Sequence, residues 1–474
     1  MPGGEAAVAA GAGMGARDRR GAGWTVPLLS VGRIGKREQS VPVLPGPAGR
    51  EPTVAAGGNR PGRMGMLRRP AESSRSMAGH HPGEERQMAG PNRGSGRTAS
   101  WRHLGAWGLV AWSMAAAIAA AADGPARLLV VSVTTGFRHA SIPVAEAALE
   151  EIGRESGLFH CAFLRQPEGR PPQPRAPQRK PDEDDAAWQA RQAAHAAEMD
   201  AFRRADEVWQ QALREQFATA FAPAALAEFD GVIFASTTGN LPIPDIDAFL
   251  GWLRGGKAFI GFHAATDTLK ASDAYCEMVG GHFAGHPWNA GGEHAFVVHE
   301  TGHRVAGMFP ERFRWKDEIY QYDGRYAPEN LRVLVSLDMA ASTPKEPWHV
   351  PVSWVRDYGK GRVFYTNFGH NEATWKEPMF RRHASEGIAW SLGRFDAPAA
   401  PNPEAQAAEY LRGVVAAAGG EQADALRARV DARIAREPGW AVGLRPRMLA
   451  LRSLPAEARS AAAAALLAEV MAER

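Results

Sequence analysis

The 474-residue sequence is poor in cysteine, in long apolar runs and in net charge. Its two cysteines, Cys161 and Cys276, form no CxxC pattern, which excludes a disulfide framework and a cysteine-based zinc motif. The formal net charge is only +3, and residues 1–100 alone hold 15 Lys and Arg against 7 Asp and Glu, so the remainder is mildly acidic. This distribution argues against a nucleic-acid partner. Stability must therefore come from a packed apolar core.

The first 122 residues have the composition of a targeting region rather than of a folded domain. Residues 1–100 are rich in Gly, Ala, Arg and Pro, so we expect a disordered, low-complexity segment. Residues 101–122 resemble the end of a secretory signal, and Met77 and Met88 are then candidates for the true start. The apolar run 104–118 is shorter than the ~20 residues of a membrane span. The sequence predicts an exported protein, periplasmic or extracellular, with no stable membrane span.

A chain that begins near Asp123 tests this interpretation. Outside the signal-like run, residues 1–122 contain no periodic apolar pattern that could contribute to a core. Their removal should therefore leave a soluble and fully folded protein, which circular dichroism and size-exclusion chromatography would show. Aggregation of the shortened chain, beside a soluble full-length chain, would contradict the prediction.

Short apolar runs alternate with amphipathic helical patterns after residue 126. Nearly continuous apolar runs are typical of strands that are buried on both faces of a parallel sheet. The alternation predicts an α/β fold, with an open, mostly parallel sheet flanked by helices, of the flavodoxin or glutamine-amidotransferase type. A Tyr-Gly-Lys-Gly turn at 358–361 adds an antiparallel hairpin. Strands are predicted at 127–133, 160–164, 229–235, 258–262, 294–299, 331–337, 352–357 and 362–367, and helices at 143–155, 184–221, 244–254, 273–279 and 378–392.

These patterns divide the folded part of the chain into a core domain and two additions. The α/β domain spans 127–397 and contains a helical insertion at 165–223, whose charged helix has the spacing of a solvated outer helix. Residues 281–288 are too rich in glycine for a core element and are predicted as a loop. Residues 398–474, rich in Ala, Glu and Arg, form a C-terminal helical extension.

Polar residues follow several of the predicted strands. His263 comes directly after the strand at 258–262, and the carboxyl edge of an open α/β sheet is where ligands bind. The loop after the first strand places Arg138 and His139 at the same edge, and His370 follows the last strand. The alternative is that His263 has a purely structural role, as a hydrogen-bonded histidine in a tight turn.

Five ordered motifs lie between residues 127 and 394. They are Thr-Gly-Phe-Arg-His (135–139), Gly-Phe-His-Ala-Ala-Thr-Asp (261–267), Gly-Gly-His-Phe-Ala-Gly-His-Pro (280–287), Asp-Glu-Ile-Tyr (317–320) and Pro-Val-Ser-Trp-Val-Arg-Asp-Tyr-Gly-Lys-Gly-Arg-Val-Phe-Tyr-Thr (351–366). Together these motifs resemble those of the ThuA-like (trehalose-utilisation) family. That family has a class I glutamine-amidotransferase-like α/β fold, and the resemblance implies a role in sugar metabolism, such as the processing of 3-keto-glycosides. The insertion 165–223 and both termini lie outside it.

The chain departs from glutamine amidotransferases at the nucleophile. Those enzymes carry their catalytic cysteine at the strand-to-helix elbow, which His263 occupies in this sequence. A histidine cannot form the required thioester, and Cys276 falls several residues into the next predicted helix. Glutamine hydrolysis is therefore excluded.

The residues and the resemblance together predict a carbohydrate-processing enzyme. It would be a hydrolase or lyase that acts on keto-sugars or glycosides by base-assisted elimination and hydration, with His263 or Glu318 as the base and Arg138, His139 or a metal stabilising an enediolate. The alternative is a non-catalytic sugar-binding module of the same fold, in which Trp288, Trp315 and Tyr320 stack on the sugar and the histidines only donate hydrogen bonds. The candidate catalytic residues are His263, Glu318, His139 and Asp267, and the candidate substrate-binding residues are Arg138, Thr238, His286, Trp288, Tyr320 and His370.

A metal ion is a separate question. Three imidazoles with one carboxylate would suit zinc or another transition metal, and His139, His263, His286 and His370 all fall at predicted loop ends. Their spacing matches no ligand motif, so neutral histidines that hydrogen-bond a sugar are the alternative. The sequence thus requires no cofactor, leaves a divalent transition metal open, and predicts a small carbohydrate as the partner.

Overall fold

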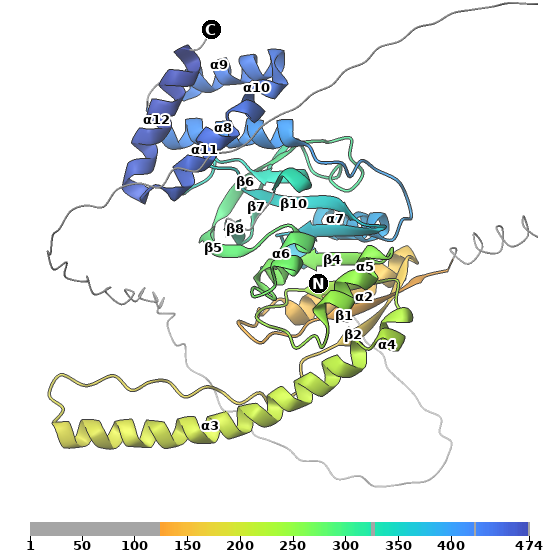
Figure 1. Ribbon diagram of the computed structural model, residues 1–474, viewed down its shortest axis with the longest axis vertical. Helices are drawn as coiled ribbons and strands as arrows, with labels where there is room; N and C mark the ends of the chain where they lie inside the picture. Colours follow the sequence, from red (N-terminus) through yellow and green to blue (C-terminus); the bar gives the residue numbers. More distant parts are fainter. Residues whose placement is uncertain (1–123, 324–327, 421–422, 473–474) are drawn as a thin grey trace, which may run out of the picture. The chain divides into compact units, whose positions relative to one another are not determined.

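The computed structural model describes residues 124–323, 328–420 and 423–472. The segments predicted at 1–100 and 101–122 lie outside these ranges, so export stays a prediction. The described residues form two sheets and the helices around them (Figure 1). The strands are β1 (Ala126–Val131), β2 (Phe159–Leu164), β3 (Gly231–Ala235), β4 (Ala258–Phe262), β5 (Phe283–Trp288), β6 (Glu293–Val298), β7 (Arg312–Lys316), β8 (Ile319–Tyr322), β9 (Arg332–Leu337), β10 (Pro351–Tyr358) and β11 (Gly361–Thr366). The α-helices are α2 (Ile142–Ser156), α3 (Asp185–Ala220), α4 (Pro223–Ala227), α5 (Ile246–Arg254), α6 (Asp273–Val279), α7 (Pro378–Ser391), α8 (Pro403–Ala418), α9 (Ala423–Arg436), α10 (Pro438–Gly443), α11 (Arg445–Ala450) and α12 (Ala456–Ala472).

The main sheet is mixed, and its parallel part carries the predicted α/β fold. Within the described residues it has nine strands, in the order β2-β1-β3-β4-β11-β10-β9-β6-β7. The first five pair in parallel, and β10, β9, β6 and β7 continue the sheet with antiparallel pairs. The fold class is confirmed, while the antiparallel part extends beyond the predicted β10–β11 hairpin. The carboxyl ends of β1, β3, β4 and β11 share one edge.

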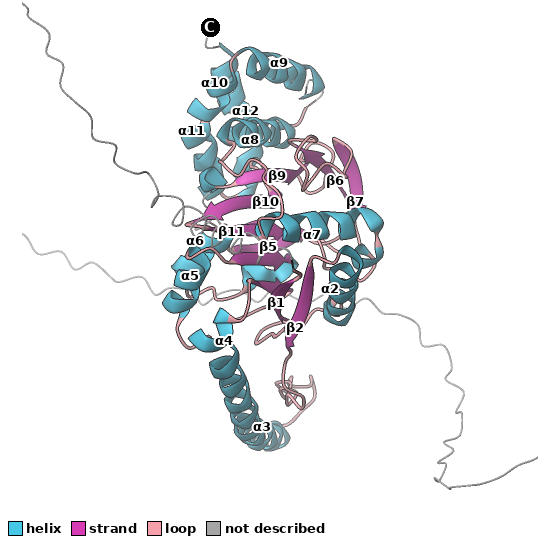
Figure 2. Cartoon of the chain, turned by 90° about the vertical axis from the view of Figure 1, so that its right-hand side faces the viewer, coloured by secondary structure: helices cyan, strands magenta, loops and turns pink. Residues whose placement is uncertain are grey.

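Helices cover both faces of this sheet, which explains its continuous apolar strands. Leu128 and Val130 of β1 pack in a cluster with α2 and α7, whereas Leu129 and Val131 pack with α5, α6 and the end of α3. Figure 2 shows α2 and α7 on one side of the sheet and α5 and α6 on the other. Each of these four β1 side chains is therefore buried, as a strand covered on both faces requires.

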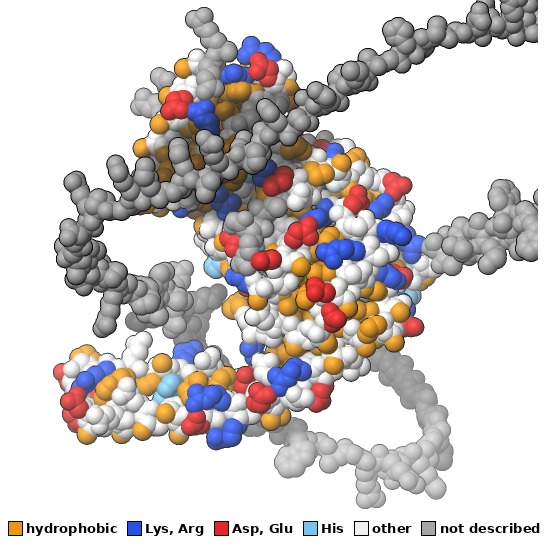
Figure 3. Space-filling view, viewed as in Figure 1, with side chains coloured by type: hydrophobic (Ala, Val, Ile, Leu, Met, Phe, Trp, Pro, Cys, Tyr) orange, Lys and Arg blue, Asp and Glu red, His pale blue; other side chains and the backbone are white. Residues whose placement is uncertain are grey.

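The insertion is a long helix that contacts the core only near its end. Of the 36 residues of α3, those buried are Trp209, Leu213 and Phe217, and charged side chains of both signs lie along the rest (Figure 3). The segment before α3 also touches the site edge. Arg170 donates to the backbone oxygen of Thr135 at 2.7 Å, and to those of its two neighbours. The insertion thus tethers the loop that follows β1.

Arg170→Ala should loosen this tether. The substitution removes hydrogen bonds to three backbone oxygens of the loop, so we expect a loss of about 1–2 kcal/mol in the free energy of unfolding, measured by urea denaturation. Arg175→Ala is the control, because Arg175 is an exposed arginine of the same segment. Equal stability of the two variants would show that the insertion only lies beside the domain.

The C-terminal residues are helical and pack beside β9. Asn402, just before α8, donates to the backbone oxygen of Val333 and accepts from its N–H, so it extends the ladder at this strand. Gly413 of α8 lies against the backbone of Trp348, where a Cβ would come within 2.7 Å of the carbonyl oxygen. Among the described residues, none of the helices has the length and apolar character needed to cross a membrane.

The prediction of a loop at 281–288 is wrong. Residues Phe283–Trp288 form β5, which pairs antiparallel with β8 in a separate two-stranded sheet. The pairing contains register shifts around Gly285, whose φ of +135° favours glycine. The glycines that suggested a loop therefore belong to an irregular strand.

Candidate functional site

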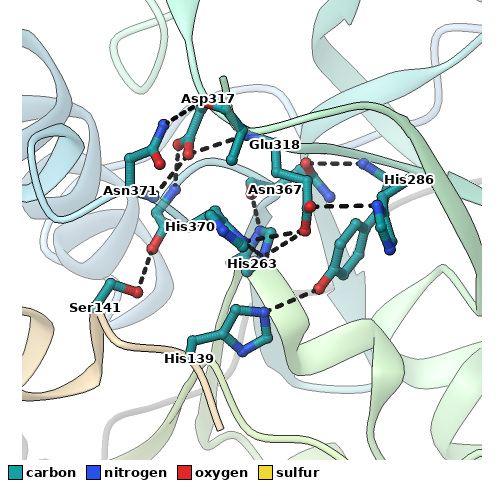
Figure 4. Close-up of polar contacts among 12 residues, drawn as sticks. His139, Ser141, His263, His286, Asp317, Glu318, Asn367, His370 and Asn371 are labelled. Carbon is teal, nitrogen blue, oxygen red and sulfur yellow. Dashed lines mark hydrogen bonds and ion pairs between the residues drawn. The ribbon is translucent and has the colours of Figure 1, made fainter. Parts of the chain in front are cut away.

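Three histidines and one glutamate from distant parts of the chain meet at the carboxyl edge of the parallel strands. His139 follows β1, His263 follows β4, His370 follows β11, and Glu318 directly precedes β8. One nitrogen or oxygen atom from each lies within 4.8 Å of the others. Figure 4 shows the four side chains pointing toward one another. We call these four residues the His-Glu cluster.

His263 is held rigidly at the elbow after β4. Its φ of +47° is unusual for a residue other than glycine, and its side chain is fully buried. Nδ1 lies 2.8 Å from the backbone oxygen of Asn367, which can only accept, so Nδ1 carries the proton. Nε2 therefore offers a lone pair to the cluster. Burial, reinforced by the nearby His139 and His370, holds the pKa of His263 well below its usual value.

Glu318 connects the buried histidines with an exposed one. Its Oε2 lies 3.1 Å from Nδ1 of His370 and 3.7 Å from Nε2 of His263, and its Oε1 lies 3.3 Å from Nδ1 of His286. Burial lowers the pKa of His370, but the hydrogen bond to Glu318 and its charge outweigh this effect and raise it. The side chain of His286 is 55% exposed, against 10% for that of Glu318. The carboxylate of Glu318 thus contacts His263 and His370 inside the cluster through Oε2 and the exposed His286 through Oε1.

His139 is the remaining member of the cluster, and its ring nitrogens are incompletely hydrogen-bonded. Its ring centroid lies 4.8 Å from that of His263 and 5.1 Å from that of His370. Nε2 is 3.4 Å from the Tyr320 hydroxyl, and Nδ1 has no hydrogen-bond partner among the described residues. Burial, followed by the charge of His370, lowers the pKa of His139 to about 4. His139 is therefore a neutral imidazole at neutral pH.

Asp317 positions the loop that carries His370, a role that the sequence did not reveal. Its carboxylate is fully buried and accepts from the N–H of Gly369 at 2.7 Å, the N–H of Asn371 at 2.8 Å, the N–H of Glu318 at 3.1 Å and the hydroxyl of Thr374 at 3.0 Å. Burial raises the pKa of Asp317 to about 6, although these hydrogen bonds act in the opposite direction. The only signal in the sequence was the position of Asp317 beside Glu318.

Aromatic side chains flank the His-Glu cluster. Phe137 is 68% exposed, and its ring meets that of His139 edge-on at 4.9 Å. The ring of Phe283 lies 4.3 Å from that of Tyr320 and stacks at 6.0 Å on that of His286. Sequence analysis missed Phe137 and Phe283, although both lie within the motifs at 135–139 and 280–287. These aromatic rings thus provide an apolar surface beside the polar side chains of the His-Glu cluster.

Four predicted site residues lie apart from the cluster. Trp288 is fully buried, and its indole N–H donates to the backbone oxygen of Pro344, so its predicted stacking on a sugar is wrong. Arg138 donates to Ser132 and Gln166 and so braces its own loop. In the same way, the hydroxyl of Thr238 donates to the backbone oxygen of Phe137, and Asp267 pairs with Lys270 at 3.2 Å.

The structure brings the other predicted site residues together. Of these, His139, His263, Glu318 and His370 form the cluster, His286 faces Glu318, and Tyr320 lies over His263 with ring centroids 4.4 Å apart. Cys276 is buried within α6 and is not at the elbow. The elbow itself therefore presents an imidazole and no thiol.

Comparison with known proteins identifies a family for the α/β domain. Residues 182–391 match the family model ThuA, described as trehalose utilisation. No curated protein sequence matches the chain. Among solved structures, a protein described as ThuA-like from Parabacteroides merdae is 17% identical (TM-score 0.39; 58% of this chain and 93% of that one), and another from Bacteroides uniformis is 18% identical (TM-score 0.38; 57% and 92%). An exo-β-1,4-mannosidase from an Opitutaceae bacterium is 10% identical (TM-score 0.29; 60% and 38%).

Proposed function

Because residues 182–391 match the ThuA family, whose description gives it a sugar-related role, we propose that the protein is an enzyme that cleaves 3-keto-glycosides. One observation carries the proposal, namely the convergence of a carboxylate and four imidazoles on one point at the sheet edge. A non-catalytic sugar-binding module needs no such convergence, because its polar groups can be spread over an open face. General acid–base chemistry does need it.

The proposed reaction uses the acidity of a carbon next to a ketone. A base removes the proton on C2 of the 3-keto sugar, and the electron pair forms the C2=C3 double bond of an enediolate. The enediolate then collapses, the C1–O bond breaks, and the aglycone leaves with its oxygen, which takes up the proton that the base removed. Water adds across the resulting C1=C2 double bond and restores the proton on C2. The sum is hydrolysis of the glycosidic bond.

The proposed base is the hydrogen-bonded pair of His286 and Glu318. When Nδ1 of His286 donates to Oε1 of Glu318, Nε2 of an imidazole that is 55% exposed is left to accept the proton. The carboxylate then stabilises the imidazolium, as an acidic residue does in a catalytic triad. His263 is less suited to this role, because it is fully buried beneath Tyr320 and its Nδ1 is engaged by Asn367.

The test compares keto-glycosides with their unoxidised parents in deuterated water. We expect the protein to release free sugar from 3-keto-trehalose or a methyl 3-keto-glucoside and to place deuterium at C2, which NMR detects. Trehalose itself should not react, because its C2 proton is not acidic. Equal rates with oxidised and unoxidised sugars, or no exchange with any keto-glycoside while the protein is folded, would refute the proposal.

Phe137 should contribute to binding rather than to chemistry. A pyranose face that stacks on its exposed ring would gain about 0.5–1.5 kcal/mol. Phe137→Ala should therefore raise KM by roughly 3- to 10-fold and leave kcat nearly unchanged, as steady-state kinetics would show. The matched control is Val208→Ala, which removes an apolar side chain that is 72% exposed on α3. A fall in kcat with constant KM would place Phe137 in the chemical step.

A further inference from the structure

Lone pairs outnumber protons in the His-Glu cluster. Nδ1 of His263 donates its proton to Asn367, so Nε2 is an acceptor, and Oε2 of Glu318 is an acceptor as well. Nδ1 of His370 lies 3.1 Å from each of these two atoms, but a neutral His370 has one proton there and can satisfy only one of them. The two acceptors face each other at 3.7 Å. A cation between them would resolve this deficit.

His139 adds another imidazole to the same space. It is 4% exposed, its Nδ1 has no hydrogen-bond partner among the described residues, and its Nε2 has only the 3.4 Å contact with Tyr320. Protein groups therefore leave this side chain incompletely satisfied. Buried imidazoles are normally hydrogen-bonded or bound to a metal.

The spacing of the four groups fits a tetrahedral ion. Zinc–ligand bonds of ~2.0–2.1 Å place neighbouring ligand atoms about 3.4 Å apart. The separations among His263 Nε2, His370 Nδ1 and Glu318 Oε2 are 3.1, 3.1 and 3.7 Å, and the atom of His139 completes the set within 4.8 Å. We infer that His139, His263, His370 and Glu318 bind a divalent transition-metal ion. Imidazole ligands favour zinc, cobalt, nickel or iron(II) over magnesium and calcium.

Groups outside the cluster orient its side chains through hydrogen bonds, as neighbouring groups usually do for metal ligands. The backbone oxygen of Asn367 fixes the tautomer of His263 with Nε2 available, which is the common arrangement for a ligating histidine. The hydrogen bonds of Asp317 to Gly369 and Asn371 fix the loop of His370. The ligands are thus oriented before any ion arrives.

The ion would supply what the proposed reaction otherwise lacks. An enediolate needs a positive group beside its oxygens, but Arg138 is engaged by Ser132 and Gln166. A transition-metal ion held by these four residues would act as a Lewis acid toward such an oxygen if it accepted that oxygen as a fifth ligand. Glu318 could then ligate through Oε2 while Oε1 holds His286. This role rests on the proposed function, whereas metal binding itself needs no substrate.

The test measures Co²⁺ and Zn²⁺ binding to the full-length protein. After treatment with a chelator and dialysis, we expect one equivalent of Co²⁺ to bind with the visible absorption of a four-coordinate site, and one equivalent of Zn²⁺ to displace it. His139→Ala, His370→Ala and Glu318→Gln should each weaken the affinity on the order of 100-fold. His160→Ala, which removes an exposed histidine of β2, should bind as the wild type does.

Circular dichroism of each apoprotein shows whether a variant is folded. If the alanine variants are unfolded, the Co²⁺ affinity of Glu318→Gln, which keeps the side-chain volume, decides the test. Binding well below one equivalent, or equal affinity in wild type and Glu318→Gln, would overturn the inference. Stoichiometric binding without turnover of any keto-glycoside would uphold the metal site and sink only the proposed reaction. Turnover by a protein that is free of metal would uphold the proposed reaction and refute only the role of the ion in it.

Discussion

Glu318→Gln should lower the turnover of a 3-keto-glycoside on the order of 100-fold or more, the lower range for loss of a general base. The substitution keeps the volume of the side chain but removes the charge that faces His286 and His370 at 3.3 and 3.1 Å. An amide cannot stabilise the imidazolium that His286 would become. The effect should appear in kcat, and in the rate of deuterium incorporation at C2.

A matched control lies close by in the chain. Glu372 is exposed and sits two residues after His370, so Glu372→Gln makes the same chemical change outside the cluster and should leave the rate unaltered. An active Glu318→Gln protein would remove the carboxylate from the mechanism and leave the imidazoles as the candidates. His263→Ala is a less direct probe, because it also creates a buried cavity and leaves the oxygen of Asn367 unpaired.

The positions of the three cluster histidines followed from the sequence because they depend on backbone periodicity. Apolar runs mark the strands, and the carboxyl ends of parallel strands share an edge. His139, His263 and His370 follow β1, β4 and β11, which all belong to the parallel part of the sheet. Glu318 required the resemblance of its Asp-Glu-Ile-Tyr motif, because it precedes a strand of the smaller sheet.

The directions of individual side chains did not follow from the sequence. Arg138 is adjacent to His139, yet it turns back to its own loop, since the oxygen of Ser132 and the side chain of Gln166 offer it partners. Trp288 ends the irregular strand β5, where register shifts opposite β8 decide which side chains face inward. Such choices depend on contacts between segments that are far apart in the sequence, and no local pattern contains them.

Asp317→Ala should have the largest effect on stability among these variants. The buried carboxylate accepts from the backbone N–H groups of Glu318, Gly369 and Asn371 and from one hydroxyl, and alanine would leave all four donors without this acceptor in a site that water does not reach. At ~1–3 kcal/mol for each unpaired buried group, partly relieved by rearrangement, we expect the free energy of unfolding to fall by at least about 3 kcal/mol. Urea denaturation measures this change.

Asp317→Asn and Asp357→Ala separate a general destabilisation from the positioning of His370. The asparagine keeps one acceptor oxygen but turns an NH₂ group toward a donor, so its stability should lie between those of wild type and Asp317→Ala. Asp357 is exposed on β10, and its removal should change stability by less than about 0.5 kcal/mol. Because Asp317 holds the loop of His370, folded Asp317→Asn protein should also bind Co²⁺ more weakly than the wild type. Unaltered Co²⁺ affinity in that variant would mean that the loop keeps its position without the carboxylate. Wild-type stability of Asp317→Ala would mean that the four donors find other partners.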